Sequence, residues 1–167
     1  QTIYGKTKLA GEIAVRKSGS GIIIRTSWLY SVFGHNFVKT ILRLSQEREQ
    51  LQVVFDQTGS PTNAGDLASA ILGMVKSDHK EKKEPRLDIY NFSNRGICSW
   101  YEFATAIKDL AGSDCLIKPV ESNDYPTPTP RPRYSVMDTK KIIHDYSTEI
   151  PHWRESLKQC ILELTAK

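Results

Sequence analysis

The sequence predicts an α/β fold with a largely parallel sheet, because helical and strand patterns alternate along the chain. A helical pattern runs from Tyr4 to about Lys17, and a strand pattern from Ile22 to Ser27 follows it. This strand is apolar on both faces, which is typical of strands buried in a parallel sheet. Few such strands are present, so we expect only part of a larger sheet, with edges that this chain does not cover.

The remaining elements continue the alternation. Further strands are predicted at Leu51–Phe55, Leu87–Phe92 and Leu116–Val120. Further helices are predicted where a residue suited to the start of a helix occurs. One follows Asn36 and ends near Glu49, one follows Asp66 over Leu67–Lys76, and one follows Ser99 over Trp100–Ala111. A short helix starts at Asp138, and a last one has Pro151 in its first turn and ends near Leu164. The segment 56–64 is predicted as a loop, and the prolines between 125 and 132 exclude a regular helix.

Composition points to an ordinary globular protein. Of its 167 residues, 39% are hydrophobic and 25% charged, and the net charge is +4. No apolar run approaches the length of a membrane span. The charged run at 79–84 mixes both signs, which favours a solvated loop over a nucleic-acid patch. We therefore expect neither a membrane nor a nucleic acid as partner.

The cysteines and the first residue indicate the context of the chain. Cys98, Cys115 and Cys160 are widely spaced and contain no Cys-x-x-Cys pair, so we expect reduced thiols in a cytoplasmic protein and no metal site. The chain opens at Gln1, directly before a helical pattern and without a methionine. We expect it to be part of a longer protein.

One pair of residues carries recognisable chemistry. Tyr4 and Lys8 form a Tyr-x-x-x-Lys motif, and residues four apart on a helix share one face. When a hydride reaches a ketone, the oxygen gains negative charge and needs a proton from a positioned acid. A cation beside a phenol stabilises phenolate and makes the phenol a better donor near neutrality, and an ammonium can also hold ribose hydroxyls. Roughly one chain in four of this size contains such a motif by chance, so a solvated helix face is the alternative reading of the pair alone.

A series of further motifs follows in order along almost the whole chain. The segments are Tyr4–Glu12, Ile24–Tyr30, Gly34–Val38, Asp56–Thr62, Asp66–Ala68, Tyr90–Phe92, Ser99–Ala104 and Tyr125–Pro132. The phrases Arg-Thr-Ser-Trp and Gly-Ser-Pro-Thr within them are more specific than Tyr-x-x-x-Lys. Together the motifs resemble the C-terminal part of the dTDP-4-dehydrorhamnose reductase family, within the extended short-chain dehydrogenase/reductases.

The resemblance implies a role for each matching residue. It assigns Tyr4 as the acid that protonates the C4 oxygen of a sugar, and Lys8 as the residue that binds the cofactor ribose and tunes Tyr4. Both count as catalytic and as cofactor-binding. Trp28 would contact the sugar, with an aromatic plug at a strand end as its alternative reading. Three further residues are expected beside the substrate: Asn36, which could instead only cap a helix, Thr62, which would shape the adjoining loop, and Arg131, which could reach a diphosphate.

The resemblance also implies an architecture. Residues 1–34 and 66–92 would belong to a doubly wound, Rossmann-type nucleotide-binding domain, and 35–65 and 93–167 to a small α/β substrate-binding domain. The glycine-rich turn that holds dinucleotide phosphates would lie before Tyr4. Gly19 and Gly21 cannot replace it, because they precede a strand. We therefore expect the isolated chain to be inactive.

The implied activity is reduction of dTDP-4-dehydro-L-rhamnose to dTDP-L-rhamnose with NADPH or NADH, a step of dTDP-rhamnose biosynthesis. Two alternatives stay open: a nucleotide-sugar epimerase or dehydratase of the same superfamily, and a non-catalytic regulatory subunit with the reductase fold. Some relatives bind a metal across a dimer, but no counterpart of those acidic residues is recognisable here. The sequence leaves a homodimer open.

Overall fold

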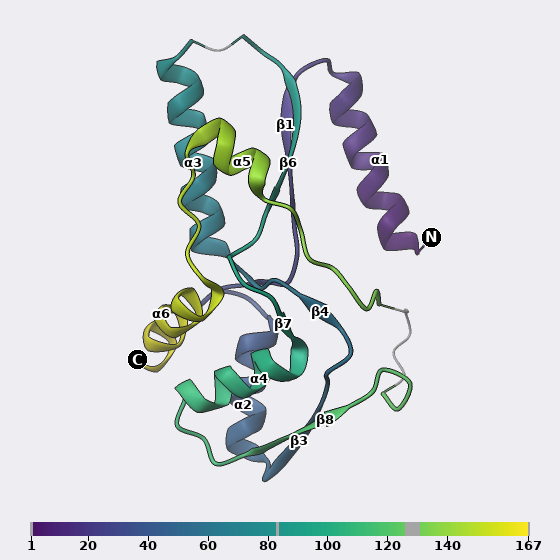
Figure 1. Ribbon diagram of the computed structural model, residues 1–167, viewed down its shortest axis with the longest axis vertical. Helices are drawn as coiled ribbons and strands as arrows, with labels where there is room; N and C mark the ends of the chain where they lie inside the picture. Colours follow the sequence, from purple (N-terminus) through teal and green to yellow (C-terminus); the bar gives the residue numbers. More distant parts are fainter. Residues whose placement is uncertain (1, 83, 126–130, 167) are drawn as a thin grey trace.

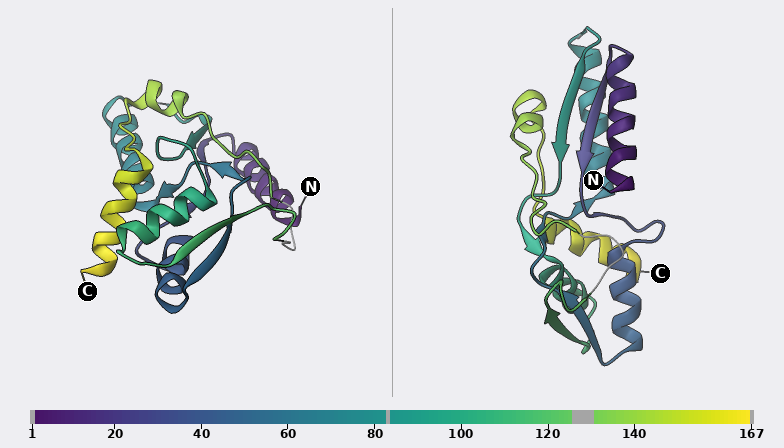
Figure 2. Two further views of the ribbon diagram at one scale, coloured as in Figure 1. Left: turned by 60° about the horizontal axis from the view of Figure 1, so that its bottom comes forward. Right: turned by 90° about the vertical axis from the view of Figure 1, so that its right-hand side faces the viewer.

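The computed structural model describes residues 2–82, 84–125 and 131–166, so most of the proline-rich segment lies outside the described residues. The elements form two lobes (Figure 1). The upper lobe holds α1, β1, α3, β6 and α5, the lower lobe holds α2, β3, β4, β7, α4 and β8, and α6 lies beside the junction (Figures 1 and 2). No helix in this described part is long and apolar enough to cross a bilayer.

The upper lobe is built on two parallel strands. β1 (Gly21–Thr26) pairs with β6 (Leu87–Phe92) over six residues, and both lie between α1 (Ile3–Lys17) and α3 (Ala64–Lys80) in Figure 1. α5 (Lys140–Tyr146) packs against β6 and α3. The core between these elements consists of Ala70, Met74, Tyr90, Phe92, Ile142 and Ile150.

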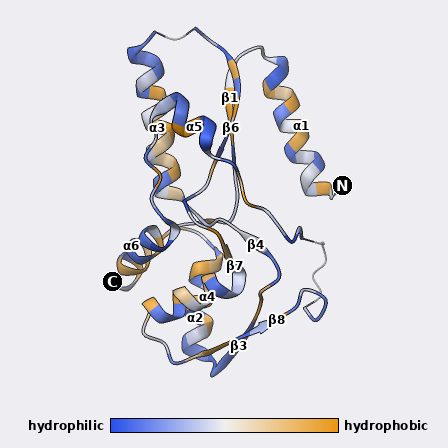
Figure 3. Ribbon diagram, viewed as in Figure 1, coloured by the Kyte–Doolittle hydropathy of each residue, from blue (hydrophilic) through white to orange (hydrophobic). Residues whose placement is uncertain are grey.

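The lower lobe repeats this plan on a smaller scale. Its parallel strands are β3 (Gln50–Val54) and β8 (Leu116–Val120). The helices around them are α2 (Phe37–Glu47), α4 (Trp100–Leu110) and α6 (Trp153–Thr165). The core residues that these helices share include Ile41, Phe103, Ile107, Trp153 and Leu157. In Figure 3, β3 and α4 carry hydrophobic segments, as buried elements should.

Four two-residue strands form two short pairs near the junction of the lobes. β2 (Leu29–Tyr30) runs parallel to β5 (Thr62–Asn63), and β4 (Thr58–Gly59) runs antiparallel to β7 (Cys98–Ser99). β4 and β5 occupy a segment predicted as a plain loop. These pairs satisfy backbone groups where the chain crosses between the two lobes.

The predicted α/β class with parallel strands is confirmed, and three predicted helix starts are wrong. Asn63 caps α3 in place of Asp66, because its side chain accepts bonds from the amides of residues 65 and 66. His152 caps α6, so Pro151 lies just before the helix. α5 begins two residues after Asp138, whose carboxylate accepts the amide of Lys140.

The three cysteines are free and buried. Burial raises the pKa of Cys98 to about 12 and that of Cys160 to about 11, so little thiolate forms near neutrality. We expect iodoacetamide at pH 8 to leave all three unmodified in the folded protein and to modify all three in urea. Peptide mapping by mass spectrometry measures this, and modification of the native protein at any of them would contradict the buried placement.

Candidate active site

Tyr4 and Lys8 lie on one face of α1 near its start. Thr2 caps the helix by accepting the amide of Gly5 at 3.1 Å, so both side chains follow within two turns of a defined helix end. The Lys8 ammonium lies 5.5 Å from the centre of the Tyr4 ring. Tyr4 is 71% exposed, which leaves the phenol open to a ligand. The spacing thus produces the expected pair of an acid and a cation.

The start of α1 and the carboxyl end of β1 lie at the same level of the molecule, as two views agree (Figures 1 and 2). The helix runs in the opposite direction to the strand that follows it. The Tyr4 end therefore approaches the end of β1, where Trp28 follows. Ligands of open parallel sheets bind outside the carboxyl ends of the strands, so this is the expected side for a site.

Trp28 has a strained backbone and closely packed neighbours. Its φ is +49°, a left-handed conformation that bulky residues rarely adopt. Its indole stacks on that of Trp100 with ring centres 3.6 Å apart and planes 10° apart. Phe37 contacts the same Trp100 ring at 4.6 Å. A Cβ added at Gly59 would lie 2.7 Å from the Trp28 ring, so a residue without a side chain is needed there.

We expect Gly59→Ala to displace the Trp28 indole, because its new methyl group would meet both this ring and the Ser135 hydroxyl within 3 Å. Loss of the parallel stack should reduce the near-UV circular dichroism of the tryptophan pair. Gly73→Ala is the matched control, since an added Cβ there meets nothing within 4 Å. An unchanged near-UV spectrum in Gly59→Ala would contradict this packing.

Asn36 and Thr62 are held by local structure. The Asn36 side chain caps α2 by accepting the amide of Lys39 at 3.2 Å and donates to the carbonyl of Ser31 at 2.8 Å. Its predicted role as an N-cap is confirmed. Thr62 is fully buried, and its hydroxyl accepts a bond from that of Thr26 at 3.1 Å. This bond joins β5 to the end of β1.

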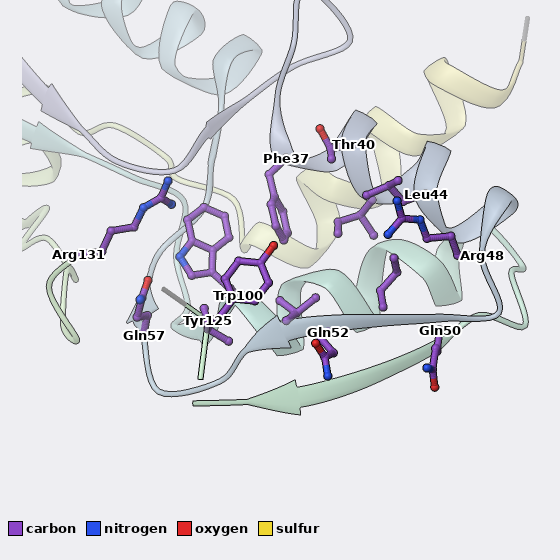
Figure 4. Close-up of a pocket in the computed structure, with 14 residues that line it drawn as sticks. Phe37, Thr40, Leu44, Arg48, Gln50, Gln52, Gln57, Trp100, Tyr125 and Arg131 are labelled. Carbon is purple, nitrogen blue, oxygen red and sulfur yellow. The ribbon is translucent and has the colours of Figure 1, made fainter. Parts of the chain in front are cut away.

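A cavity of about 550 Å³ lies between α2 and β3 (Figure 4). Within the described residues β3 pairs only with β8, so its other edge faces this cavity unpaired. The lining combines apolar and aromatic side chains with three glutamines and two arginines, and includes Phe37, Leu44, Trp100, Tyr125, Gln57, Arg48 and Arg131. Figure 4 shows the two arginines at opposite ends of the cavity. Such a lining suits a flat ring system attached to an anionic group.

The structure brings the predicted residues together in two groups. Tyr4 and Lys8 form one. In the other, Trp28 stacks on Trp100, which lines the same cavity as Arg131. The sequence predicts a helix from Trp100 and does not single out Trp100, Gln57 or Arg48 as site residues. Gln57 is buried, with its amide donating to the Ser122 hydroxyl at 2.8 Å. Its position in the Asp-Gln-x-Gly-Ser-Pro-Thr motif was the available signal.

The described residues fit only part of a nicotinamide nucleotide. The exposed Lys8 ammonium and Tyr4 hydroxyl could hold its ribose. Gly19 and Gly21 both have positive φ, but they connect a helix to a strand. The phosphate-binding turn of a dinucleotide site connects a strand to a helix, so these glycines do not form one.

Comparison with known proteins identifies the family. The family described as "RmlD substrate binding domain" matches residues 1–166. The chain belongs to the RmlD, or dTDP-4-dehydrorhamnose reductase, family. The family predicted from the motifs is thereby confirmed.

Two curated relatives show how much of a longer protein the chain matches. The spore coat polysaccharide biosynthesis protein SpsK of Bacillus subtilis is 43% identical over 164 residues, which cover 98% of this chain and 55% of that protein. The dTDP-4-dehydrorhamnose reductase of Escherichia coli K12 is 34% identical over 169 residues, covering 97% of this chain and 56% of that protein. The chain thus spans about half the length of these relatives.

Solved structures of dTDP-4-dehydrorhamnose reductases superpose closely on this chain. The dTDP-4-dehydrorhamnose reductase of Clostridium acetobutylicum superposes with a TM-score of 0.89 at 37% identity, over 98% of this chain and 56% of that one. The enzyme of Bacillus anthracis, solved in complex with NADP, gives 0.86 at 37% identity, over 97% of this chain and 55% of that one. A UDP-galactose 4-epimerase gives 0.77 at 17% identity, over 99% of this chain and 54% of that one, which shows a shared fold alone.

Proposed function

We propose that the protein to which this chain belongs reduces the C4 keto group of a nucleotide-linked deoxysugar, dTDP-4-dehydro-L-rhamnose, in the cytoplasm with NADPH or NADH. The observation that supports this most is the Tyr4–Lys8 pair, with the ammonium 5.5 Å from the phenol ring on an exposed helix face. Family membership and the NADP-bound relative add to it.

In this proposal, Tyr4 supplies the proton of the reduction. A bound reduced nicotinamide would supply the hydride. As the C4 carbonyl becomes an alkoxide, Tyr4 donates its hydroxyl proton to that oxygen and is left as phenolate. The Lys8 ammonium stabilises the phenolate through its charge and holds the cofactor ribose by hydrogen bonds. Solvent protonates Tyr4 again before the next turnover.

The substrate would lie between Tyr4 and the cavity. Trp28 would contact the sugar, and the neighbouring cavity beside Trp100 would take the nucleotide base against its aromatic walls. Arg131 would bind the diphosphate through its fork of donors. Asn36 would hold the loop beside the sugar through its cap, and Thr62 would support that loop from within.

The activity would belong to a longer protein that also contains a phosphate-binding turn, and the isolated chain would be inactive. Residues 1–34 and 66–92 would join its nucleotide-binding domain, and 35–65 and 93–167 would form its substrate-binding domain. The chain's share of about half of each relative's length supports the proposal of a longer protein.

Incubation of the full-length protein with NADPH and dTDP-4-dehydro-L-rhamnose tests the proposal. We expect one NADPH oxidised for each sugar converted, with dTDP-L-rhamnose as product by nuclear magnetic resonance. An epimerase or a dehydratase would change the sugar without net cofactor oxidation, and a regulatory subunit would change nothing. Either result would overturn the proposal.

A further inference from the structure

We propose that Glu12 and Arg25 form a positioning pair that sets the rotation of α1 and so aims Tyr4 and Lys8 at the substrate. This inference rests on the proposed function, since it concerns the same reaction. The residues act through the helix and do not touch the reacting atoms.

The pair has a geometry that fixes direction. Arg25 donates from Nε to one carboxylate oxygen of Glu12 and from a terminal nitrogen to the other, both at 2.7 Å. Such a two-point contact between planar groups restrains orientation as well as distance. The Glu12 side chain is 16% exposed and that of Arg25 48%. The hydrogen bond from Arg25 also lowers the pKa of Glu12, so the carboxylate stays charged near neutrality.

Within the part of the protein that this chain spans, about half the length of its relatives, α1 is held to β1 mainly by this pair. None of its 15 residues is buried, and only Glu12 and Val15 are partly buried. Hydrophobic and hydrophilic residues alternate along it (Figure 3), and its apolar side chains Ile3, Leu9 and Ile13 lie in the open. Val15 packs near Gly21 at the end of the helix far from Tyr4. No residue of α1 belongs to the core of the upper lobe as this chain forms it, so within this chain the ion pair is the contact that restrains the direction of the helix against β1.

The position of Glu12 connects it to the reactive pair. Residues 4, 8 and 12 are each four apart, so they follow one stripe of the helix. Glu12 lies about 12 Å along the axis from Tyr4. Arg25 stands on β1, three residues before Trp28. The ion pair thus ties the helix that carries the proton donor to the strand that leads to the proposed sugar contact.

The test is a charge exchange in the full-length protein. Glu12→Gln and Arg25→Gln should each lower kcat about tenfold or more, because a displacement near 1 Å at reacting groups can cost a hundredfold. The KM for the nucleotide sugar should change less than about twofold, since no substrate contact is removed. Glu12→Arg combined with Arg25→Glu should restore most of kcat. Arg43→Gln is the matched control, because it breaks an exposed ion pair with Glu47 on α2.

Three results would overturn the inference. They are unchanged kcat in both single variants, a rise in KM in place of a fall in kcat, and a folded double variant that stays as slow as the single ones. Thermal unfolding of each variant reports its folding. Tyr4→Phe, measured in the same assay, reports on the proposed function separately. An unchanged kcat in Tyr4→Phe would contradict the proton-donor role and, with it, the positioning role. A large loss of kcat in Tyr4→Phe beside an unchanged kcat in the Glu12 and Arg25 variants would overturn the positioning role alone.

Discussion

In the full-length protein, Tyr4→Phe should lower kcat by a factor of about 10²–10⁴, the usual contribution of a positioned acid. The substitution removes the hydroxyl and keeps the ring near the Lys8 ammonium, so folding and cofactor binding should persist. Steady-state oxidation of NADPH with the 4-keto nucleotide sugar measures the effect. Tyr101→Phe is the matched control, because Tyr101 is half-buried against the lower core and outside both groups of site residues.

The same account predicts that Lys8→Met lowers kcat and raises the KM for NADPH, because one ammonium serves both the phenolate and the ribose. Lys17→Met, at the other end of α1, should change neither quantity. Full turnover in Tyr4→Phe would contradict the proton-donor assignment. An unchanged KM for NADPH in Lys8→Met would contradict the ribose contact.

The largest effect on stability is expected at Asn94, which is 1% exposed at the junction of the lobes. Its amide nitrogen donates to the Asp66 carboxylate at 2.6 Å, and its oxygen accepts the Asn63 amide at 2.7 Å. The Ser156 hydroxyl of α6 donates to the same carboxylate at 2.6 Å. Asn94→Ala leaves these partners buried with fewer bonds, so we expect a loss of about 2–4 kcal/mol in the free energy of unfolding.

Urea unfolding followed by tryptophan fluorescence measures this loss as a shift in midpoint. Asn91→Ala is the control, because Asn91 lies three residues earlier and makes one solvent-accessible bond, to the Asp138 carbonyl at 3.1 Å. It should cost less than about 1 kcal/mol. Equal shifts in the two variants would contradict a special role for the buried hydrogen bonds that Asn94 makes at the junction of the lobes.

Local signals account for the parts of the fold that the sequence predicts well. The apolar run Ile22–Ile24 identifies β1, because a strand covered on both faces is apolar at consecutive positions. The helical spacing after Tyr4 identifies α1, because a helix repeats every 3.6 residues. Ser99 and Asn36 are recognisable as caps because each precedes a helical series of apolar residues. The sequence does not fix the start of α3, because Asn63 and Asp66 are both good caps and only the backbone geometry decides between them.

The site was predictable only where its residues are close in sequence. Tyr4 and Lys8 share a helix turn, so their contact follows from spacing. The Trp28–Trp100 stack joins residues 72 positions apart through packing of β2, β4 and α4, and no local pattern encodes it. No local pattern encodes the hydrogen bonds of Asn94 at the junction of the lobes, or the cavity between α2 and the unpaired edge of β3.

The central claim is hydride delivery to C4 of a nucleotide-linked keto sugar, and isotope transfer tests it most directly. The full-length protein would be incubated with dTDP-4-dehydro-L-rhamnose and NADPH carrying deuterium at both positions of the nicotinamide C4. We predict dTDP-L-rhamnose with one deuterium at C4 of the sugar and an equal amount of oxidised cofactor. A sugar product without deuterium at C4, or no conversion by a folded protein that binds NADPH, would contradict the account.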